Sequence, residues 1–128
     1  MIFKNGEGFK PDEIIQNTPQ DLAQIQLNAY NAKDIESFLA VYSNDVEVYE
    51  FPDKLLYKGI EKMRETYQPF FKSSPELHCK LVNRIVNGNY VIDQELITGN
   101  PRKPEINATA MYEVDGGLIK KIWFLKLP

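Results

Sequence analysis

Two hairpin signals in the second half of the chain constrain its fold more than any other feature. Asn87-Gly88, the dipeptide that most favours a two-residue hairpin turn, separates two segments of alternating apolar and polar residues. An Asp-Gly-Gly turn at 115–117 separates a second such pair. Residues 100–104 contain two prolines, which cannot donate to a strand ladder, so an irregular loop is expected there. The pattern predicts an antiparallel meander with strands at 77–86, 90–99, 106–114 and 118–127.

Helical patterns precede this meander. Thr18 stands directly before Pro19 and three residues before Asp21, which is the arrangement of a capped helix start. Asp34 can cap a second, short helix, and a third pattern of apolar residues spaced by three or four follows Gly59. Helices are therefore expected at 19–31, 35–42 and 60–73.

A short strand between the second and third helices carries a candidate catalytic residue. Alternation places Val46, Val48 and Glu50 on one face. If that face lines a pocket, desolvation raises the pKa of Glu50 and suits it to act as a general base. The alternative is a solvated carboxylate at a strand end, and the residues alone favour it.

The order of these elements predicts an α+β fold in which helices cover one face of a curved sheet. With 128 residues the chain is long enough for one domain with a hydrophobic core. Residues 1–17 lack periodicity and are expected to form an N-terminal arm, followed by a domain at 18–128.

Composition excludes several functions. The chain has 15 basic and 18 acidic residues and a net charge of −3, without a basic stripe, so no nucleic-acid partner is expected. The single cysteine, Cys79, excludes an internal disulfide and a cysteine-based zinc cluster. No run of about 18 apolar residues occurs, and no signal peptide is recognisable, so a cytoplasmic protein without a membrane partner is expected. No cofactor is expected, since glycine-rich phosphate-binding loops are absent.

The first hairpin has one apolar and one charged face. Across a two-residue turn, odd positions of the first strand share a face with even positions of the second. Periodicity alone favours the charged face as the solvent side, with cross-strand ion pairs. The apolar face holds Leu77, Cys79, Leu81, Ile85, Ile92 and Leu96, and the charged face holds His78, Lys80, Val82, Arg84, Val91, Asp93, Glu95 and Ile97.

Three runs of the chain resemble the nuclear transport factor 2-like superfamily, in its SnoaL-like and ketosteroid-isomerase-like branches. They are YNAKDIESFLAVYSNDVEVY at 30–49, LYKGIE at 56–61 and DGGLIKKIWF at 115–124. The resemblance implies a cone in which a curved mixed or antiparallel sheet and three N-terminal helices enclose an apolar pocket. It does not imply one activity, because the superfamily holds isomerases, cyclases, dehydratases, hydrolases and proteins without known chemistry.

The resemblance to ketosteroid isomerases also assigns positions. Their catalytic aspartate base corresponds to Glu50, whereas the two proton donors of their oxyanion hole correspond to Gln26 and Ala110. Loss of one such donor typically costs about 10²–10³ in rate. Steroid isomerisation by that mechanism is therefore not expected.

The same resemblance implies that the charged face of the hairpin points toward the pocket, with His78 and Arg84 near Asp93 and Glu95. It implies Glu50, Asp93 and His78 as catalytic candidates. The opposite face, with Cys79, Leu81, Ile92, Leu96 and Trp123, would then be outward and apolar, which implies a homodimer. The implied substrate-binding residues are Glu95, Tyr67, Tyr112, Met63, Phe124 and Tyr57.

Three functions remain open from the sequence. The first is a cofactor-independent isomerase or lyase that moves a proton on a small hydrophobic carbonyl compound, with Glu50 or Asp93 as base and His78, Tyr67 or Tyr112 polarising the oxygen. The second is a non-catalytic module that binds a small apolar ligand. The third is a dimeric scaffold whose pocket is filled by its own aromatic side chains. A metal site of His78, Asp93 and Glu95 has no recognised spacing, and an ion-paired cluster is favoured over it.

Overall fold

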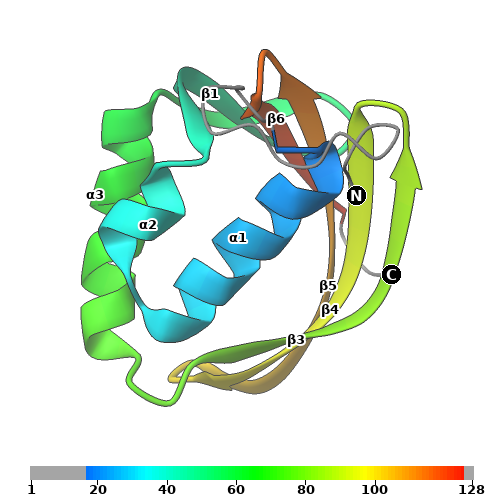
Figure 1. Ribbon diagram of the computed structural model, residues 1–128. Coiled ribbons are helices and arrows are strands. Elements are labelled where there is room, and N and C mark those ends of the chain that lie inside the picture. The colour runs from blue at the N-terminus through cyan, green and yellow to red at the C-terminus, as the bar shows by residue number, and fades with distance from the viewer. Residues whose placement is uncertain (1–16, 126–128) are drawn as a thin grey trace, which may run out of the picture.

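The structure is a computed structural model that describes residues 17–125 (Figure 1). The expected arm at 1–17 lies outside the described residues except for Asn17. Within 17–125 the chain forms helices α1 (Pro19–Ala32), α2 (Ile35–Leu39) and α3 (Ile60–Ser73), and strands β1 (Tyr42–Glu50), β2 (Lys54–Lys58), β3 (His78–Asn87), β4 (Tyr90–Asn100), β5 (Lys103–Asp115) and β6 (Leu118–Leu125).

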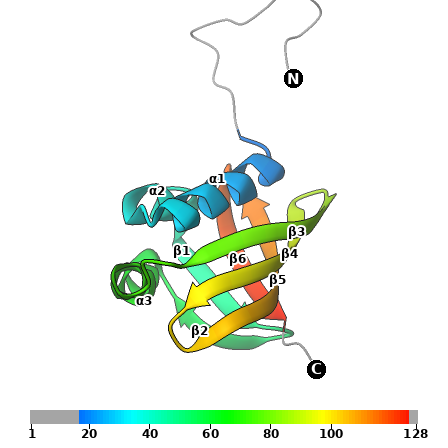
Figure 2. The same cartoon turned by 90° about the horizontal axis from the view of Figure 1, so that it is seen from below.

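One curved sheet contains all the described strands, in the order β2-β1-β6-β5-β4-β3. Neighbouring strands are antiparallel except for β1 and β6, which are parallel, so the sheet is mixed. The helices lie on its concave face, and α1 crosses the strands (Figures 1 and 2). The predicted α+β architecture, with three helices against a curved sheet, is confirmed.

Local interactions fix both ends of α1. The Thr18 hydroxyl accepts from the Asp21 backbone N–H, and the Asp21 carboxylate accepts from the Thr18 N–H, each at 3.1 Å. Lys33 ends the helix in a left-handed conformation with φ 55°, and its ammonium donates to the Leu77 carbonyl. Asn31 donates to the Cys79 carbonyl at 2.9 Å and accepts from its N–H at 2.7 Å. These contacts hold the sheet-edge strand β3 against the helix.

Helix α2 ends at Leu39, three residues earlier than predicted. Tyr42 instead begins β1, where its backbone pairs with Ile119 of β6. The rings of Phe38 and Tyr42 are still in contact, with centroids 5.2 Å apart. The helical spacing of these aromatic residues therefore reflected a tertiary contact rather than one continuous helix.

A β-bulge at Val82 reverses part of the predicted hairpin face. Near the turn the register agrees with the prediction, and Arg84 pairs with Asp93. One extra residue in β3 then shifts the pairing, so that Leu81 pairs with Glu95 and Cys79 with Ile97. A one-residue shift exchanges the two faces. The outward positions of Cys79 and Leu81 and the inward position of His78, which the resemblance implied, are therefore wrong.

The expected irregular loop at 100–104 is shorter in the structure. Asn100 pairs with Lys103, which leaves a two-residue turn, and Pro104 lies within β5. Strand β6 pairs with β5 only as far as Thr109 in the described part of the chain. Pro104 therefore stands where β5 has a neighbour on one side, a position that tolerates a missing N–H.

The core fills the space between the helices and the concave face. Met63 from α3, Phe38 from α2 and Val46 from β1 are almost inaccessible to solvent. Five aromatic rings from α1, α2, β1 and α3 contact one another, with centroids 4.8 to 6.5 Å apart. This cluster positions three phenol groups beside the cavity described below. Its members are Tyr30, Phe38, Tyr42, Tyr67 and Phe71.

Candidate functional site

A cavity of about 220 Å³ lies between the helices and the concave face of the sheet. Typical ligand pockets measure roughly 300–1,000 Å³, so this cavity suits a compact ligand. Its apolar walls include Leu27, Phe38, Phe70, Ile97, Ile122 and Phe124. Its polar lining includes Gln26, Tyr42, Tyr67, Glu95, Asn100 and Tyr112.

Glu95 on β4 is the carboxyl group of the cavity wall, and 8% of the residue is exposed. Burial raises its pKa from 4.5 to about 7, because the carboxylate loses hydration. The nearby Asp93 charge raises this pKa further, while a hydrogen bond from Cys79 and the charge of Arg84 lower it. At neutral pH both the acid and the carboxylate of Glu95 are therefore populated.

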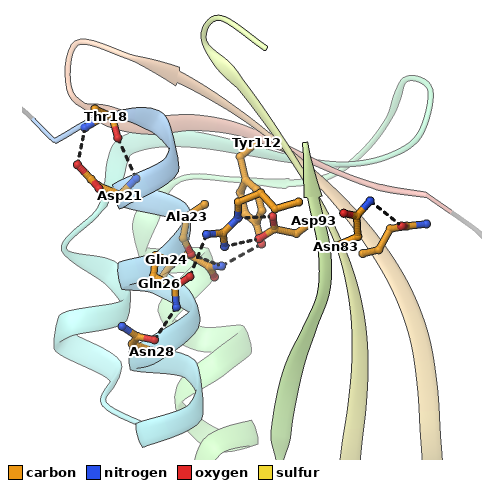
Figure 3. Close-up of polar contacts among 11 residues, drawn as sticks. Thr18, Asp21, Ala23, Gln24, Gln26, Asn28, Asn83, Asp93 and Tyr112 are labelled. Carbon is orange, nitrogen blue, oxygen red and sulfur yellow. Dashed lines mark hydrogen bonds and ion pairs between the residues drawn. The ribbon is translucent and has the colours of Figure 1, made fainter. Parts of the chain in front are cut away.

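Asp93 lies two residues earlier on the same strand and has a different environment. It is 0% exposed and forms a bidentate ion pair with Arg84, with Nε–Oδ1 at 2.7 Å and Nη2–Oδ2 at 2.9 Å (Figure 3). Arg84 also donates from Nη1 to Gln24 of α1 at 2.9 Å. Both carboxylate oxygens of Asp93 are thus engaged, and Asp93 is not among the residues that line the cavity.

A chain of hydrogen bonds runs from Tyr42 through Gln26 to Tyr112, and all three residues line the cavity. The Tyr42 hydroxyl donates to Gln26 Oε1 at 3.1 Å. Gln26 Nε2 donates to the Ala23 carbonyl at 3.0 Å and to the Tyr112 hydroxyl at 3.1 Å (Figure 3). The Tyr112 oxygen therefore acts as an acceptor, and its own hydrogen has no acceptor within residues 17–125.

Burial keeps the phenols of this network protonated. It raises the pKa values of Tyr42 and Tyr112 well above 10, and the charge of Glu95 adds to both effects. Glu95 and Tyr112 lie on neighbouring strands and both line the cavity. The site thus presents an ionisable carboxyl group and a neutral hydroxyl donor to the same small space.

Cys79 also lines the cavity, beside Glu95. Burial raises the pKa of its thiol above the ordinary value, and the charge of Glu95 adds to that effect. A thiol that stays protonated is a poor nucleophile, so Cys79 acts here as a weak hydrogen-bond donor to Glu95.

Four of the expected substrate-binding residues line the cavity, namely Glu95, Tyr67, Tyr112 and Phe124. Met63 lies fully buried in the core and Tyr57 packs against the core, so neither lines the cavity.

The structure separates the three expected catalytic residues. Glu50 ends β1, where its backbone pairs with the cavity residue Phe124, but Glu50 is not itself part of the lining. Asp93 is held in its ion pair with Arg84. His78 is exposed at the start of β3, because the bulge at Val82 turns it to the outer face.

Gln26, Tyr42 and Cys79 were not among the predicted site residues. Gln26 could have been predicted from helical spacing, because it follows Leu22 by four residues and precedes Ala29 by three. This spacing places its amide on the buried face of α1. The sequence gives no indication that Cys79 lines the cavity, because its inward position depends on the bulge at Val82.

The described residues contain no group of three or more His, Cys, Asp or Glu side chains that could hold a metal ion. No helix in the described part of the chain is long and apolar enough to cross a membrane.

Comparison with known proteins places this geometry in a family. A model described as SnoaL-like domain matches residues 24–122. No curated protein matches the chain.

Solved structures share the fold at low sequence identity. A cystatin-fold protein from Novosphingobium aromaticivorans is 21% identical, with 86% of this chain and 99% of that chain covered and a TM-score of 0.78. A candidate polyketide cyclase from Sinorhizobium meliloti is 12% identical, with 81% and 93% covered and a TM-score of 0.70. A candidate ketosteroid isomerase from Kribbella flavida is 19% identical, with 88% and 84% covered and a TM-score of 0.66. These likenesses confirm the nuclear transport factor 2-like fold.

Proposed function

Because the chain belongs to the SnoaL-like domain family and carries an ionisable carboxyl group in its cavity, we propose that it binds a small hydrophobic carbonyl compound and transfers a proton on it. The reaction class is that of a cofactor-independent isomerase or lyase. The observation that carries the proposal is Glu95, whose pKa is raised to about 7 by burial in the cavity wall.

Glu95 is the proposed general base. A base is most effective when its pKa lies near the working pH, because it is then both deprotonated and a strong enough proton acceptor. The pKa of about 7 supports this role at neutral pH. A well-placed general base contributes roughly 10²–10⁴-fold to a rate.

Tyr112 is the proposed donor to the carbonyl oxygen. Its hydroxyl is neutral, and Gln26 holds its oxygen so that its hydrogen remains available for a ligand. Glu95 then removes a proton from the carbon next to the carbonyl, and the resulting enolate oxygen is stabilised by the Tyr112 hydrogen bond. Return of the proton to a different carbon completes an isomerisation. Loss of a leaving group from the β-carbon, with the proton of Glu95 passing to that group, completes an elimination.

Deuterium exchange tests this proposal without knowledge of the natural substrate. Phenyl ketones incubated with the protein in D₂O should lose their α-protons, as followed by proton NMR. Glu95→Gln should slow this exchange by about 10²-fold or more and preserve ketone binding. Tyr112→Phe should also slow it, because the enolate loses its donor.

Glu50→Gln is the matched comparison, since it makes the same chemical change at a carboxylate outside the cavity lining. It should leave the exchange rate within about twofold of the wild type, since it removes no group that contacts the ketone. Loss of exchange in Glu50→Gln with normal exchange in Glu95→Gln would instead identify Glu50 as the base. Ketone binding without any exchange by the wild type would favour the non-catalytic binding module.

We also propose that the outer face of the sheet pairs two copies of the chain. Cross-strand partners form an apolar row over all six described strands. Its Tyr49 and Trp123 rings stack with centroids 5.7 Å apart. Lys121 and Glu47 lie beside the row and form an ion pair. The row runs through Leu55, Tyr49, Trp123, Met111, Ile92 and Ile85.

A further inference from the structure

A second hollow lies next to the cavity. It is an open groove of about 690 Å³ between the C-terminal half of α3 and the turn that joins β4 to β5. Tyr67, Phe70 and Asn100 line both the groove and the cavity. These three side chains therefore form a wall that the cavity and the groove share.

Among the described residues, the groove has a single charged side chain in its lining, the cation Arg102. Its guanidinium has no carboxylate partner within residues 17–125. The turn that carries it is ordered, since the Asn100 side chain accepts from the Arg102 backbone N–H at 2.8 Å and Asn100 pairs with Lys103. Arg102 therefore presents an exposed guanidinium beside the groove, which is able to donate charge-assisted hydrogen bonds to an anionic group.

Hydroxyl groups at the end of α3 give a second observation. Thr66 and Ser73 also line the groove, but their hydroxyls donate to helix carbonyls at 2.8 and 3.3 Å. Ser74, in contrast, is buried and its hydroxyl has no partner in the described part of the chain. A buried hydroxyl without a partner costs about 1–3 kcal/mol. The groove is therefore bordered by the guanidinium of Arg102 and by Ser74, whose unpaired hydroxyl is buried beneath its surface.

We infer that the groove receives a carboxylate tail of the ligand whose carbonyl end occupies the cavity. This inference rests on the proposed function, since it names the class of compound that reaches Glu95. One guanidinium without a second cation suits a singly charged carboxylate better than a phosphate. The ligand class is therefore a keto acid in which an apolar spacer, lying along Tyr67 and Phe70, separates the ketone from the carboxylate.

A pair of probes differing only in charge tests the inference. 5-Oxo-5-phenylpentanoate carries an aryl ketone, a three-carbon spacer and a carboxylate, and its methyl ester lacks the charge. Calorimetric titration at neutral pH should find the acid bound about tenfold more tightly than the ester by the wild type, as expected for one charge-assisted hydrogen bond. Arg102→Gln should remove this preference and leave the affinity for the ester unchanged.

Lys103→Gln is the matched control, because Lys103 is the next residue and also exposed but does not line the groove. It should preserve the preference for the acid. Equal affinities for acid and ester, an equal loss of preference in Lys103→Gln, or no binding of either probe would overturn the inference.

Deuterium exchange separates this outcome from failure of the proposed function. Exchange of the ester without any preference for the acid would retain Glu95 as base and reject the carboxylate site. Arg102-dependent binding of the acid without exchange would retain the carboxylate site and reject catalysis.

Discussion

At the scale of single residues, the environment of a side chain decides its role more than its type does. Asp93 and Glu95 are two carboxyl groups two residues apart on β4. Asp93 has both oxygens bound by Arg84, whereas Glu95 faces the cavity with only a thiol donor and has a pKa of about 7. Asp93 therefore has a structural role through its ion pair with Arg84, whereas Glu95 is able to exchange a proton.

The raised pKa of Glu95 has a cost in stability. Between pH 4.5, its ordinary pKa, and about 7, its folded pKa, the folded protein holds a proton that the unfolded chain has lost. The contribution of Glu95 to the free energy of unfolding therefore falls as the pH rises through this window and is lowest above pH 7. The shift corresponds to a penalty on the order of 3 kcal/mol.

Glu95→Gln should remove this penalty. Chemical denaturation at pH 5 and pH 8 should find the variant more stable relative to the wild type at pH 8 than at pH 5, by on the order of 2–3 kcal/mol. Glu113→Gln, an outward-facing change on the neighbouring strand, provides the control. An identical pH dependence in wild type and Glu95→Gln would contradict the raised pKa.

At the scale of elements, turns and caps were readable from the sequence because short-range chemistry determines them. Asn87-Gly88 and the Thr18 cap are located as predicted. The bulge at Val82 was not readable, because it depends on how β3 fits against α1 and β4. That one inserted position decided whether His78 or Cys79 faced the cavity, so the errors at these two positions have a common origin.

Asn31 offers a test of this packing. Its side chain forms hydrogen bonds with both the backbone N–H and the carbonyl of Cys79, as a neighbouring strand would. Cys79 lies on the cavity wall. Asn31→Ala should lower the free energy of unfolding by about 1–3 kcal/mol, because two backbone groups lose their partner.

Asn28→Ala removes an exposed amide from the same helix, whose bond is to Gln24. It should change stability by less than about 0.5 kcal/mol. Equal effects of the two substitutions in urea denaturation would show that the contact with Cys79 does not support β3.

At the scale of the whole molecule, the order of helices and strands was sufficient to predict the layers, and the resemblance to a superfamily supplied the curvature and the pocket. The cavity, however, is small, and Glu95 rather than Glu50 is the carboxyl group in its lining. A sequence alignment identifies corresponding positions along a strand. It does not show which of the carboxylates is buried and loses its hydration. That property arises only from the assembled walls.

The apolar row on the outer face predicts a dimer. Ile85 is 53% exposed, so Ile85→Lys should cost the isolated fold little and should convert the dimer to a monomer by placing a charge in the interface. Val82→Lys, at the exposed bulge outside the row, should leave the dimer intact. Analytical ultracentrifugation distinguishes these outcomes, and a wild type that sediments as a monomer at micromolar concentration would refute the proposed pairing.

The most direct test of the account is a carboxyl carbon-13 NMR titration of Glu95, assigned by comparison with Glu95→Gln. If Glu95 is the base, its carboxyl group should titrate with a midpoint near pH 7, raised by burial in the cavity wall. A bound phenyl ketone should shift this midpoint, because the ligand displaces water next to the carboxyl group. A midpoint near the ordinary value of 4.5, unaffected by ligand, would contradict the assignment of Glu95 as the base.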